Sequence, residues 1–412
     1  MKYIHKFLLF VVLISLKNTT VYAEVFGIEP FKREGLINPH YFVAYQSKVY
    51  FVASDQTYGY EWRVFDPQTQ TISLLADIYP GPSDGYPGHP IVFQNKLFFQ
   101  AEDGKHGVEL WSYDGASNQV AMVQDIFPGV ESSYPNRMAA YQEKLYIQAK
   151  GEKGGFETWV WDPRSQKATL AVDICSGKCH GIPGYMTVHE DQLYLRAKDD
   201  EFGFELWKYD GFSRQAERLS DINPADEDAF PAYLTFYRGK LYFQAKDKKY
   251  GHELYVYDPV TDVTSMVVDL WPGASGSYPS YLTVLDDHLY FRAKDPEGGY
   301  ELWRLESSSL RPEIVVDKRP GPDNFLGDQF VAYQGKLYMS GLDDSGENET
   351  LWEFDPQTRK YKPLIPNSDL VSLLEIFPFE NQLYISGTSD NTIFRFWRYD
   401  LDSRQLYPEP TQ

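Results

Sequence analysis

The chain repeats itself every 48 residues. An apolar residue followed by an aromatic one recurs at this step, and at a last step of 46, in Val49-Tyr50, Leu97-Phe98, Leu145-Tyr146, Leu193-Tyr194, Leu241-Tyr242, Leu289-Tyr290, Leu337-Tyr338 and Leu383-Tyr384. A glutamate keeps step at Glu61, Glu109, Glu157, Glu205, Glu253, Glu301 and Glu349. A fixed period indicates that one structural unit has been duplicated, and the unit then determines the fold.

One unit, from Pro279 to Asp317, predicts four antiparallel strands. Apolar or alternating segments at 281–285, 288–294, 300–305 and 313–316 are separated by turns rich in Asp, Gly, Pro and Ser. After the first residues, no segment has a sustained helical period. We therefore predict an all-β fold, a single eight-bladed β-propeller of four-stranded blades over residues 24–412. A ring of seven blades with a degenerate unit is the alternative.

Closing such a ring requires that its first and last strands find partners. Residues 25–29 align with the fourth strand of a unit, and the last unit has an irregular tail near 405–407. We expect 25–29 to pair with that last unit as a clasp.

The first 23 residues are typical of a secretory signal peptide. Lys2 and Lys6 precede a short apolar run from Phe7 to Leu16, and small residues up to Ala23 suit a cleavage site. The run is shorter than the roughly 20 residues that a membrane span requires. We expect a secreted or periplasmic protein with no membrane span.

Charge and cysteine usage restrict the partners. Acidic residues outnumber basic ones by 59 to 39, a net charge of −20, so phosphate backbones are repelled and nucleic acid is excluded as a partner. Cys175 and Cys179 are the two cysteines, and in an oxidising compartment we expect them to form a disulfide. The alternative is a metal site that adds His180.

The units also carry a longer motif. In the second unit it reads Leu97-Phe98-Phe99, Asp103, His106-Gly107, Glu109-Leu110-Trp111, Asp114-Gly115, and then Asp125-Ile126-Phe127-Pro128-Gly129. This pattern resembles the ELWxxDGT-repeat proteins, although Ala116 replaces the final Thr. The resemblance covers most of the chain. It implies an exported propeller or repeat protein and assigns little chemistry.

Aspartates gather at one end of the units. Some begin the hairpin between the second and third strands (Asp55, Asp103, Asp199, Asp247, Asp295, Asp343), and others precede the link to the next unit (Asp77, Asp125, Asp173, Asp221, Asp269, Asp317). Aspartate commonly accepts hydrogen bonds from N–H groups of its own turn. We favour this structural role, with calcium binding as the alternative; no other cofactor is predicted.

Positions that vary between units are better binding candidates. Two residues after each linker proline, the chain enters the innermost strand near the mouth of the channel. We call these positions the channel-mouth ring: Tyr41, His89, Arg137, Tyr185, Tyr233, Tyr281, Gln329 and Glu375. Tyrosine offers an apolar face and a hydroxyl to sugars or peptides. A second candidate set lies at the linker tips: Tyr79, Phe127, Trp271 and Arg319.

Catalytic signals are weak. The sequence has no G-x-S-x-G, H-E-x-x-H or phosphate-loop motif, and no catalytic residue is predicted. We expect a non-enzymatic binding or scaffold propeller that engages a protein or glycan through the face bearing the inter-blade links. The alternatives are a polysaccharide-acting hydrolase or lyase with two carboxylates at the channel mouth, and a calcium-stabilised structural protein. The oligomeric state stays open.

Overall fold

The computed structural model describes residues 35–408, apart from 153, 178, 225–226, 307–310, 319–320, 367–369 and 391. The expected signal peptide and the expected clasp at 25–29 lie outside these residues. Leu36–Gln412 forms one compact unit.

The described residues form eight four-stranded antiparallel sheets, the blades, each built from four consecutive strands. Blades 1 to 4 contain β1 (Ile37–Tyr45), β2 (Lys48–Asp55), β3 (Gly59–Asp66), β4 (Thr71–Leu74); β5 (Gly88–Phe93), β6 (Lys96–Glu102), β7 (Val108–Asp114), β8 (Gln119–Gln124); β9 (Asn136–Tyr141), β10 (Lys144–Lys150), β11 (Phe156–Asp162), β12 (Lys167–Val172); β13 (Gly184–His189), β14 (Gln192–Ala197), β15 (Glu205–Asp210) and β16 (Gln215–Arg218).

Blades 5 to 8 contain β17 (Ala232–Tyr237), β18 (Lys240–Asp247), β19 (Gly251–Asp258), β20 (Val263–Val268); β21 (Ser280–Leu285), β22 (His288–Lys294), β23 (Tyr300–Leu305), β24 (Pro312–Val316); β25 (Leu326–Tyr333), β26 (Lys336–Leu342), β27 (Glu349–Asp355), β28 (Lys360–Pro363); β29 (Ser372–Phe379), β30 (Gln382–Thr388), β31 (Arg395–Asp400) and β32 (Gln405–Pro408). The predicted eight-bladed propeller is confirmed. The seven-bladed alternative is wrong, because β29–β32 make a complete blade.

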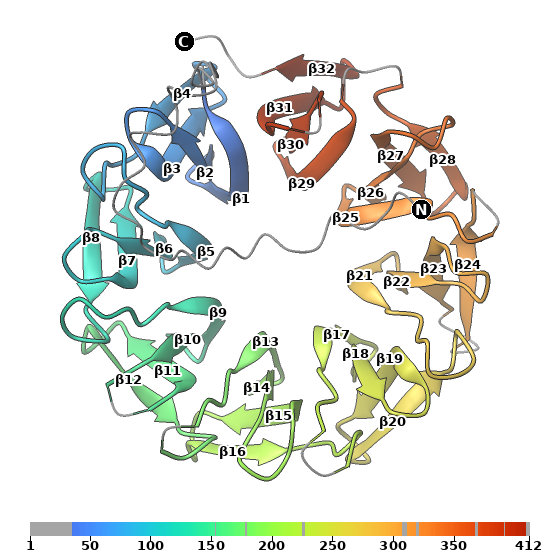
Figure 1. Cartoon of the computed structure of the whole chain (residues 1–412), viewed down its shortest axis with the longest axis horizontal. Coiled ribbons are helices and arrows are strands. Elements are labelled where there is room, and N and C mark those ends of the chain that lie inside the picture. Colours follow the sequence, from blue (N-terminus) through green and yellow to red (C-terminus); the bar gives the residue numbers. More distant parts are fainter. Residues whose placement is uncertain are drawn as a thin grey trace, which may run out of the picture. The chain divides into compact units, whose positions relative to one another are not determined.

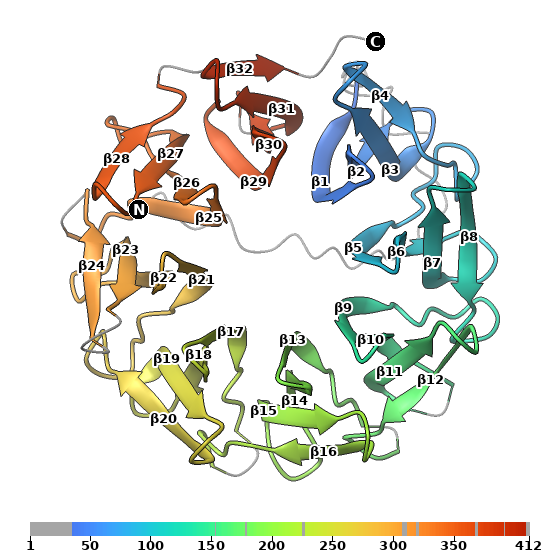
Figure 2. The ribbon, with the colours of Figure 1, turned by 180° about the vertical axis from the view of Figure 1, so that it is seen from behind.

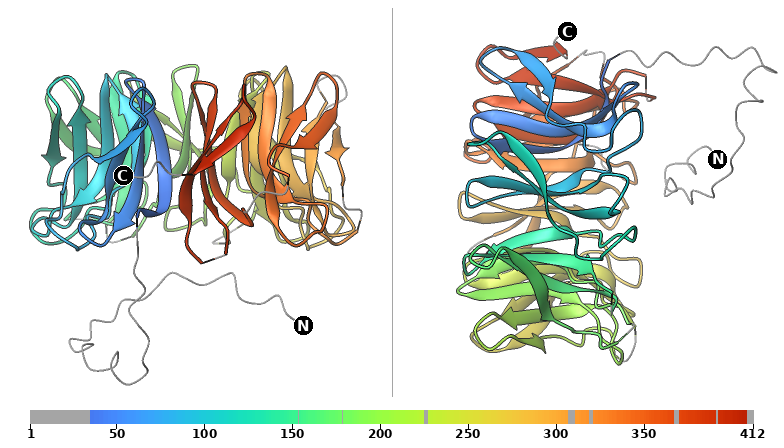
Figure 3. Two further views of the ribbon diagram at one scale, coloured as in Figure 1. Left: turned by 90° about the horizontal axis from the view of Figure 1, so that it is seen from above. Right: turned by 90° about the vertical axis from the view of Figure 1, so that its left-hand side faces the viewer.

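The blades follow one another around a ring, with the first strand of each innermost and the fourth outermost (Figures 1 and 2). Blade 8 lies beside blade 1, and the edge-on view shows loops at both ends of the blades (Figure 3). Because each blade is an antiparallel meander, the hairpin between its second and third strands and the link to the next blade share one face. We call this the link face.

The turns between first and second strands explain the regular register. Each has two residues, for example Gln46-Ser47 and Asp286-Asp287, and in both pairs the two residues have positive φ. Two-residue loops with positive φ at both positions have the twist that antiparallel strands require. The turn predicted at Asp286-Asp287 is therefore present.

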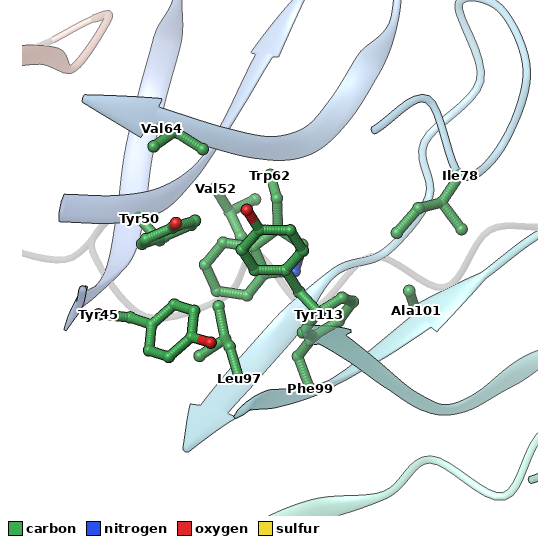
Figure 4. Packing of buried hydrophobic residues seen from close by; sticks show 10 residues of the cluster. All are labelled: Tyr45, Tyr50, Val52, Trp62, Val64, Ile78, Leu97, Phe99, Ala101 and Tyr113. Carbon is green, nitrogen blue, oxygen red and sulfur yellow. The ribbon is translucent and has the colours of Figure 1, made fainter. Parts of the chain in front are cut away.

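The core lies between blades rather than within one. Trp62 of blade 1 and Phe99 of blade 2 are fully buried, with ring centroids 5.4 Å apart, and Ala101 leaves room beside them (Figure 4). Tyr45 also reaches across this boundary: its hydroxyl donates to Asn95 O (2.7 Å) and accepts from Gly115 N (3.0 Å). The recurring aromatic residues therefore bind each blade to the next.

The recurring glutamate anchors the link to the next blade. Glu109 is fully buried on β7, and its carboxylate accepts hydrogen bonds from Ile126 N (2.7 Å), Ser133 N (2.9 Å) and Ser133 Oγ (2.6 Å). Glu253 makes the same three contacts in blade 5. A buried carboxylate must be hydrogen-bonded, and here its donors are the backbone of the link.

Blades 8 and 1 close the ring through backbone and side-chain contacts. Asn38 N donates to Phe394 O (2.9 Å), and Arg395 Nη1 donates to Leu36 O (2.9 Å). The fourth strand of blade 8 is β32, in the tail that looked irregular in the sequence. Among the described residues, no helix is long and apolar enough to cross a membrane.

Candidate functional site

The channel-mouth ring lies on the innermost strands of all eight blades. Its members occupy β1, β5, β9, β13, β17, β21, β25 and β29. In the first six blades the residue has a left-handed backbone, with φ of 57° at Tyr41, 53° at His89, 49° at Arg137, 51° at Tyr185, 57° at Tyr233 and 56° at Tyr281.

This backbone belongs to an irregularity in the strand. The pairing of β13 with β14 shifts between Gly184 and Thr187, on either side of Tyr185. Such bulges redirect a side chain, and a left-handed residue other than glycine costs about 1–3 kcal/mol. The same strained conformation recurs in six blades, so the fold keeps these side chains in one orientation.

Neighbouring ring side chains contact one another. Tyr41 Oη lies 3.4 Å from His89 Nε2. On the other side of the ring, the centroid of Tyr233 is 5.7 Å from that of Tyr185 and 5.3 Å from that of Tyr281. Tyr185, Tyr233 and Tyr281 therefore form a continuous aromatic stripe, which we call the tyrosine stripe.

Burial keeps the His89 imidazole of the ring uncharged at neutral pH. Burial, and then the charge of Arg137, lowers the pKa of His89 to about 4. Burial also raises the pKa of Tyr233 far above its usual value. At pH 7 the ring presents a neutral imidazole and tyrosine hydroxyls, with Arg137 as its cation.

Glu375 has a structural task at the seam of the ring. Its carboxylate accepts hydrogen bonds from Tyr41 N (2.8 Å) and Phe42 N (3.1 Å), which joins blade 8 to blade 1. Burial raises the pKa of Glu375 to about 7. Both oxygens are engaged, so this carboxylate is poorly placed to attack or protonate a sugar.

The described linker tips fold back onto the next blade. A Cβ on Gly104 would lie 2.8 Å from Tyr79 Cζ, and one on Gly298 would lie 3.7 Å from Trp271 Cη2. Lys150 Nζ lies 5.0 Å from the centre of the Phe127 ring. These three aromatics are half-buried, and Arg319 lies outside the described residues.

The aspartates of the link face accept hydrogen bonds from their own turns. Asp55 Oδ1 accepts from Thr57 N and Tyr58 N (both 2.8 Å), and Asp103, Asp199 and Asp247 repeat this pattern. Before the links, Asp125 accepts from the glycine four residues later at 3.1 Å. These contacts match the structural role favoured from the sequence.

The two cysteines form the expected disulfide, Cys175–Cys179, with Cα atoms 5.3 Å apart. The alternative metal site is therefore wrong, because both sulfurs are bonded to each other. His180 Nδ1 accepts a hydrogen bond from Phe156 N (3.0 Å).

A cavity of about 380 Å³ opens beside blade 3, and sequence reasoning missed it. Trp159, Leu170, Asp125 and Glu152 are among its lining residues. Blade 3 has Gly151 where other blades begin this hairpin with aspartate, and a Cβ there would lie 2.4 Å from the Trp159 ring. That missing aspartate was the signal in the sequence.

Sequence reasoning also missed two cations near the ring. Arg196 lies on β14, opposite Gly184 of β13, and Lys198 follows the end of β14. Glutamine occupies the position of Arg196 in blades 2, 3 and 5, at Gln100, Gln148 and Gln244. This change to a cation within an acidic chain could have been noticed.

Comparison with solved structures finds hydrolases. No protein-family model and no curated protein matches the chain. A puromycin-hydrolysing peptidase of Mycobacterium tuberculosis matches with a TM-score of 0.53, at 12% identity over 79% of this chain and 54% of that chain. A puromycin hydrolase matches with a TM-score of 0.54, at 10% identity over 92% and 54%. A structure from a study of two prolyl endopeptidases matches with a TM-score of 0.54, at 11% identity over 89% and 55%.

These likenesses correct the expected function. The expectation of a non-enzymatic binding or scaffold propeller is wrong, because the similar structures come from peptidases and hydrolases. The chain spans about half the length of each of them. At 10–12% identity the likeness establishes the fold, and it places the chain among propellers of this architecture.

Proposed function

We propose that this chain is a peptidase-like propeller, whose channel-mouth ring contacts oligopeptide substrates of a hydrolytic enzyme. The observation that carries the proposal is the match, over 79–92% of this chain, to peptidase and hydrolase structures with TM-scores of 0.53 and 0.54. Because the chain spans about half of each of those enzymes, the proposal concerns the propeller part of such a hydrolase.

The chemistry of the ring supports a peptide ligand. Peptides present amide groups, apolar side chains and charged ends. The tyrosine stripe offers aromatic faces and hydroxyl groups, and neutral His89 can donate or accept a hydrogen bond. Aromatic residues with a few placed polar groups are typical of ligand sites.

Binding of fluorescently labelled decapeptides, measured by anisotropy, tests the proposal. We expect the double variant Tyr233→Ala/Tyr281→Ala to bind about 5- to 150-fold more weakly, since each aromatic contact contributes about 0.5–1.5 kcal/mol. Phe212→Ala is the matched control. Phe212 is 79% exposed and lies in a turn on the face opposite the links, so this variant should bind as the wild type does.

Hydrolysis is tested on the protein isolated from its natural source with any associated component. Mass spectrometry of the decapeptides after incubation should show cleavage products, and the tyrosine double variant should form them more slowly. Absence of peptide binding to the wild type, or equal binding by the double variant and the control, would refute the proposal.

A further inference from the structure

Cations and aromatic rings alternate from the channel-mouth ring outward along blade 4. The Arg137 guanidinium carbon lies 5.4 Å from the centre of the Tyr185 ring, and that of Arg196 lies 5.0 Å from the same ring. Arg196 is also 4.8 Å from the centre of Phe204, and Lys198 Nζ is 5.2 Å from it. We call these five residues the cation ladder.

The three cations of the ladder have no carboxylate partner among the described residues. Arg196 is half-buried, and its Nε is buried without a hydrogen bond. The carboxylate that acts on it electrostatically is that of Asp228, which accepts a hydrogen bond from Phe204 N (2.8 Å). Three unpaired cations are unexpected in a chain with a net charge of −20. Like charges side by side repel, and a bound anion relieves that repulsion.

Blade 6 shows the same position with its charge neutralised. Arg292 occupies the place of Arg196 two blades later, and it lies 3.5 Å from the centre of the Tyr300 ring. Its Nη2 pairs with Asp328 at 3.1 Å. Asp328 lies on β25 of blade 7, and the residue two blades earlier that corresponds to it by spacing is the buried Ala232 of β17. Arg196 therefore lacks the acid that blade 7 supplies to Arg292.

Glycine helps to fix the position of Arg137. A Cβ on Gly184 would lie 3.1 Å from Arg137 Cδ and 3.4 Å from its Nη1. The side chain of Arg137 thus lies against the backbone of the next blade, directly before Tyr185. Arg137 is nevertheless an exposed residue.

We propose that Arg137, Arg196 and Lys198 bind a carboxylate, the C-terminal carboxylate of a peptide whose last side chains lie on the tyrosine stripe. This inference rests on the proposed peptide-contacting function. Guanidinium groups match the planar geometry of a carboxylate and bind it through paired charge-assisted hydrogen bonds. Tyr185 belongs to both the ladder and the stripe, so a ligand that reaches the arginines also meets the aromatic faces.

Three decapeptides of one sequence test the proposal: one with a free C-terminal carboxylate, one amidated, and one amidated with an internal glutamate. The full chain should bind the free acid at least about tenfold more tightly than either amide, because only the free acid makes the charge-assisted bonds. Arg137→Gln and Arg196→Gln should remove this difference. Arg292→Gln is the matched control and should keep it, since Arg292 already has a carboxylate partner. Thermal unfolding checks that each variant is folded.

The outcomes separate the two proposals. If free acid and amide bind equally, the carboxylate site is wrong while the peptide-contacting function stands. If no peptide binds, both are wrong. Tighter binding of the internal-glutamate peptide would reassign the site to acidic side chains. Inorganic phosphate should compete no better than acetate with the free-acid peptide; stronger competition by phosphate would overturn the carboxylate assignment.

Discussion

Replacing Glu253 tests the role given to the recurring glutamate. Its side chain is fully buried, and it accepts hydrogen bonds from Leu270 N (3.1 Å), Ser277 N (2.8 Å) and Ser277 Oγ (2.6 Å). Glu253→Ala leaves three buried donors without an acceptor. Each such donor costs about 1–2 kcal/mol, so we expect the free energy of unfolding to fall by about 3–6 kcal/mol.

Two further variants apportion this loss. Ser277→Ala removes only the hydroxyl donor and should cost about 1 kcal/mol. Blades 1 and 3 have Gly85 and Gly181 at the position of Ser277 and therefore lack this hydroxyl donor. Glu253→Gln should cost less than Glu253→Ala, because burial raises the pKa of Glu253 and an amide resembles the protonated carboxyl.

Urea unfolding followed by tryptophan fluorescence measures these differences as shifts of the midpoint at constant slope. Glu217→Ala, an outer-strand variant whose side chain is 60% exposed, serves as control and should change stability by less than about 0.5 kcal/mol. A loss below about 1 kcal/mol for Glu253→Ala would refute the anchoring role. A loss equal to that of Ser277→Ala would show that the backbone contacts contribute nothing.

Two further predictions concern pH and backbone conformation. Burial raises the pKa of Glu61 to about 8 and that of Glu109 and Glu157 to about 7. The folded state then holds more protons than the unfolded state, so the stability should fall as pH rises from about 5 to 8.5. The slope of stability against pH should be smaller in Glu109→Gln/Glu157→Gln. A Tm that rises over this range in high salt would contradict the prediction. Gly107→Ala should cost at least about 1 kcal/mol more stability than Gly239→Ala. Both glycines have φ near 70°, but a Cβ on Gly107 would lie 2.5 Å from Glu131 O, whereas Gly239 faces open space. Equal unfolding midpoints in urea would contradict this prediction.

The sequence by itself determined the architecture. The period of 48 residues gave the number of blades, and the alternation within one unit gave its four strands. Both signals are local, because turn residues and alternating strands act within a few positions of each other. The two-residue turn at Asp286-Asp287 is an example, because its two residues of positive φ join β21 and β22 as the local sequence predicts.

The period also misled in one blade. By the step of 48, Glu349 is the counterpart of Glu301. The strand register disagrees: Glu301 pairs with Ala293, and the counterpart of Ala293, Gly341, pairs with Thr350. One inserted residue shifts a strand's side chains to the other face. Glu349 still accepts hydrogen bonds from the start of β29, from Ser372 Oγ (2.8 Å) and Leu373 N (3.0 Å).

Tertiary structure decided how equivalent positions meet. The period identified Arg137 and Tyr185 as counterparts, whereas the closed ring places one beside the other, with Gly184 making room. The surroundings of Arg196 were likewise decided by the fold. Its partner ring, Tyr185, and the position without an acid, Ala232, lie on the innermost strands of two different blades. The physical reason is that contacts between blades join residues about 48 positions apart, whose distance follows from ring closure and the strained inner strands and not from local sequence preference.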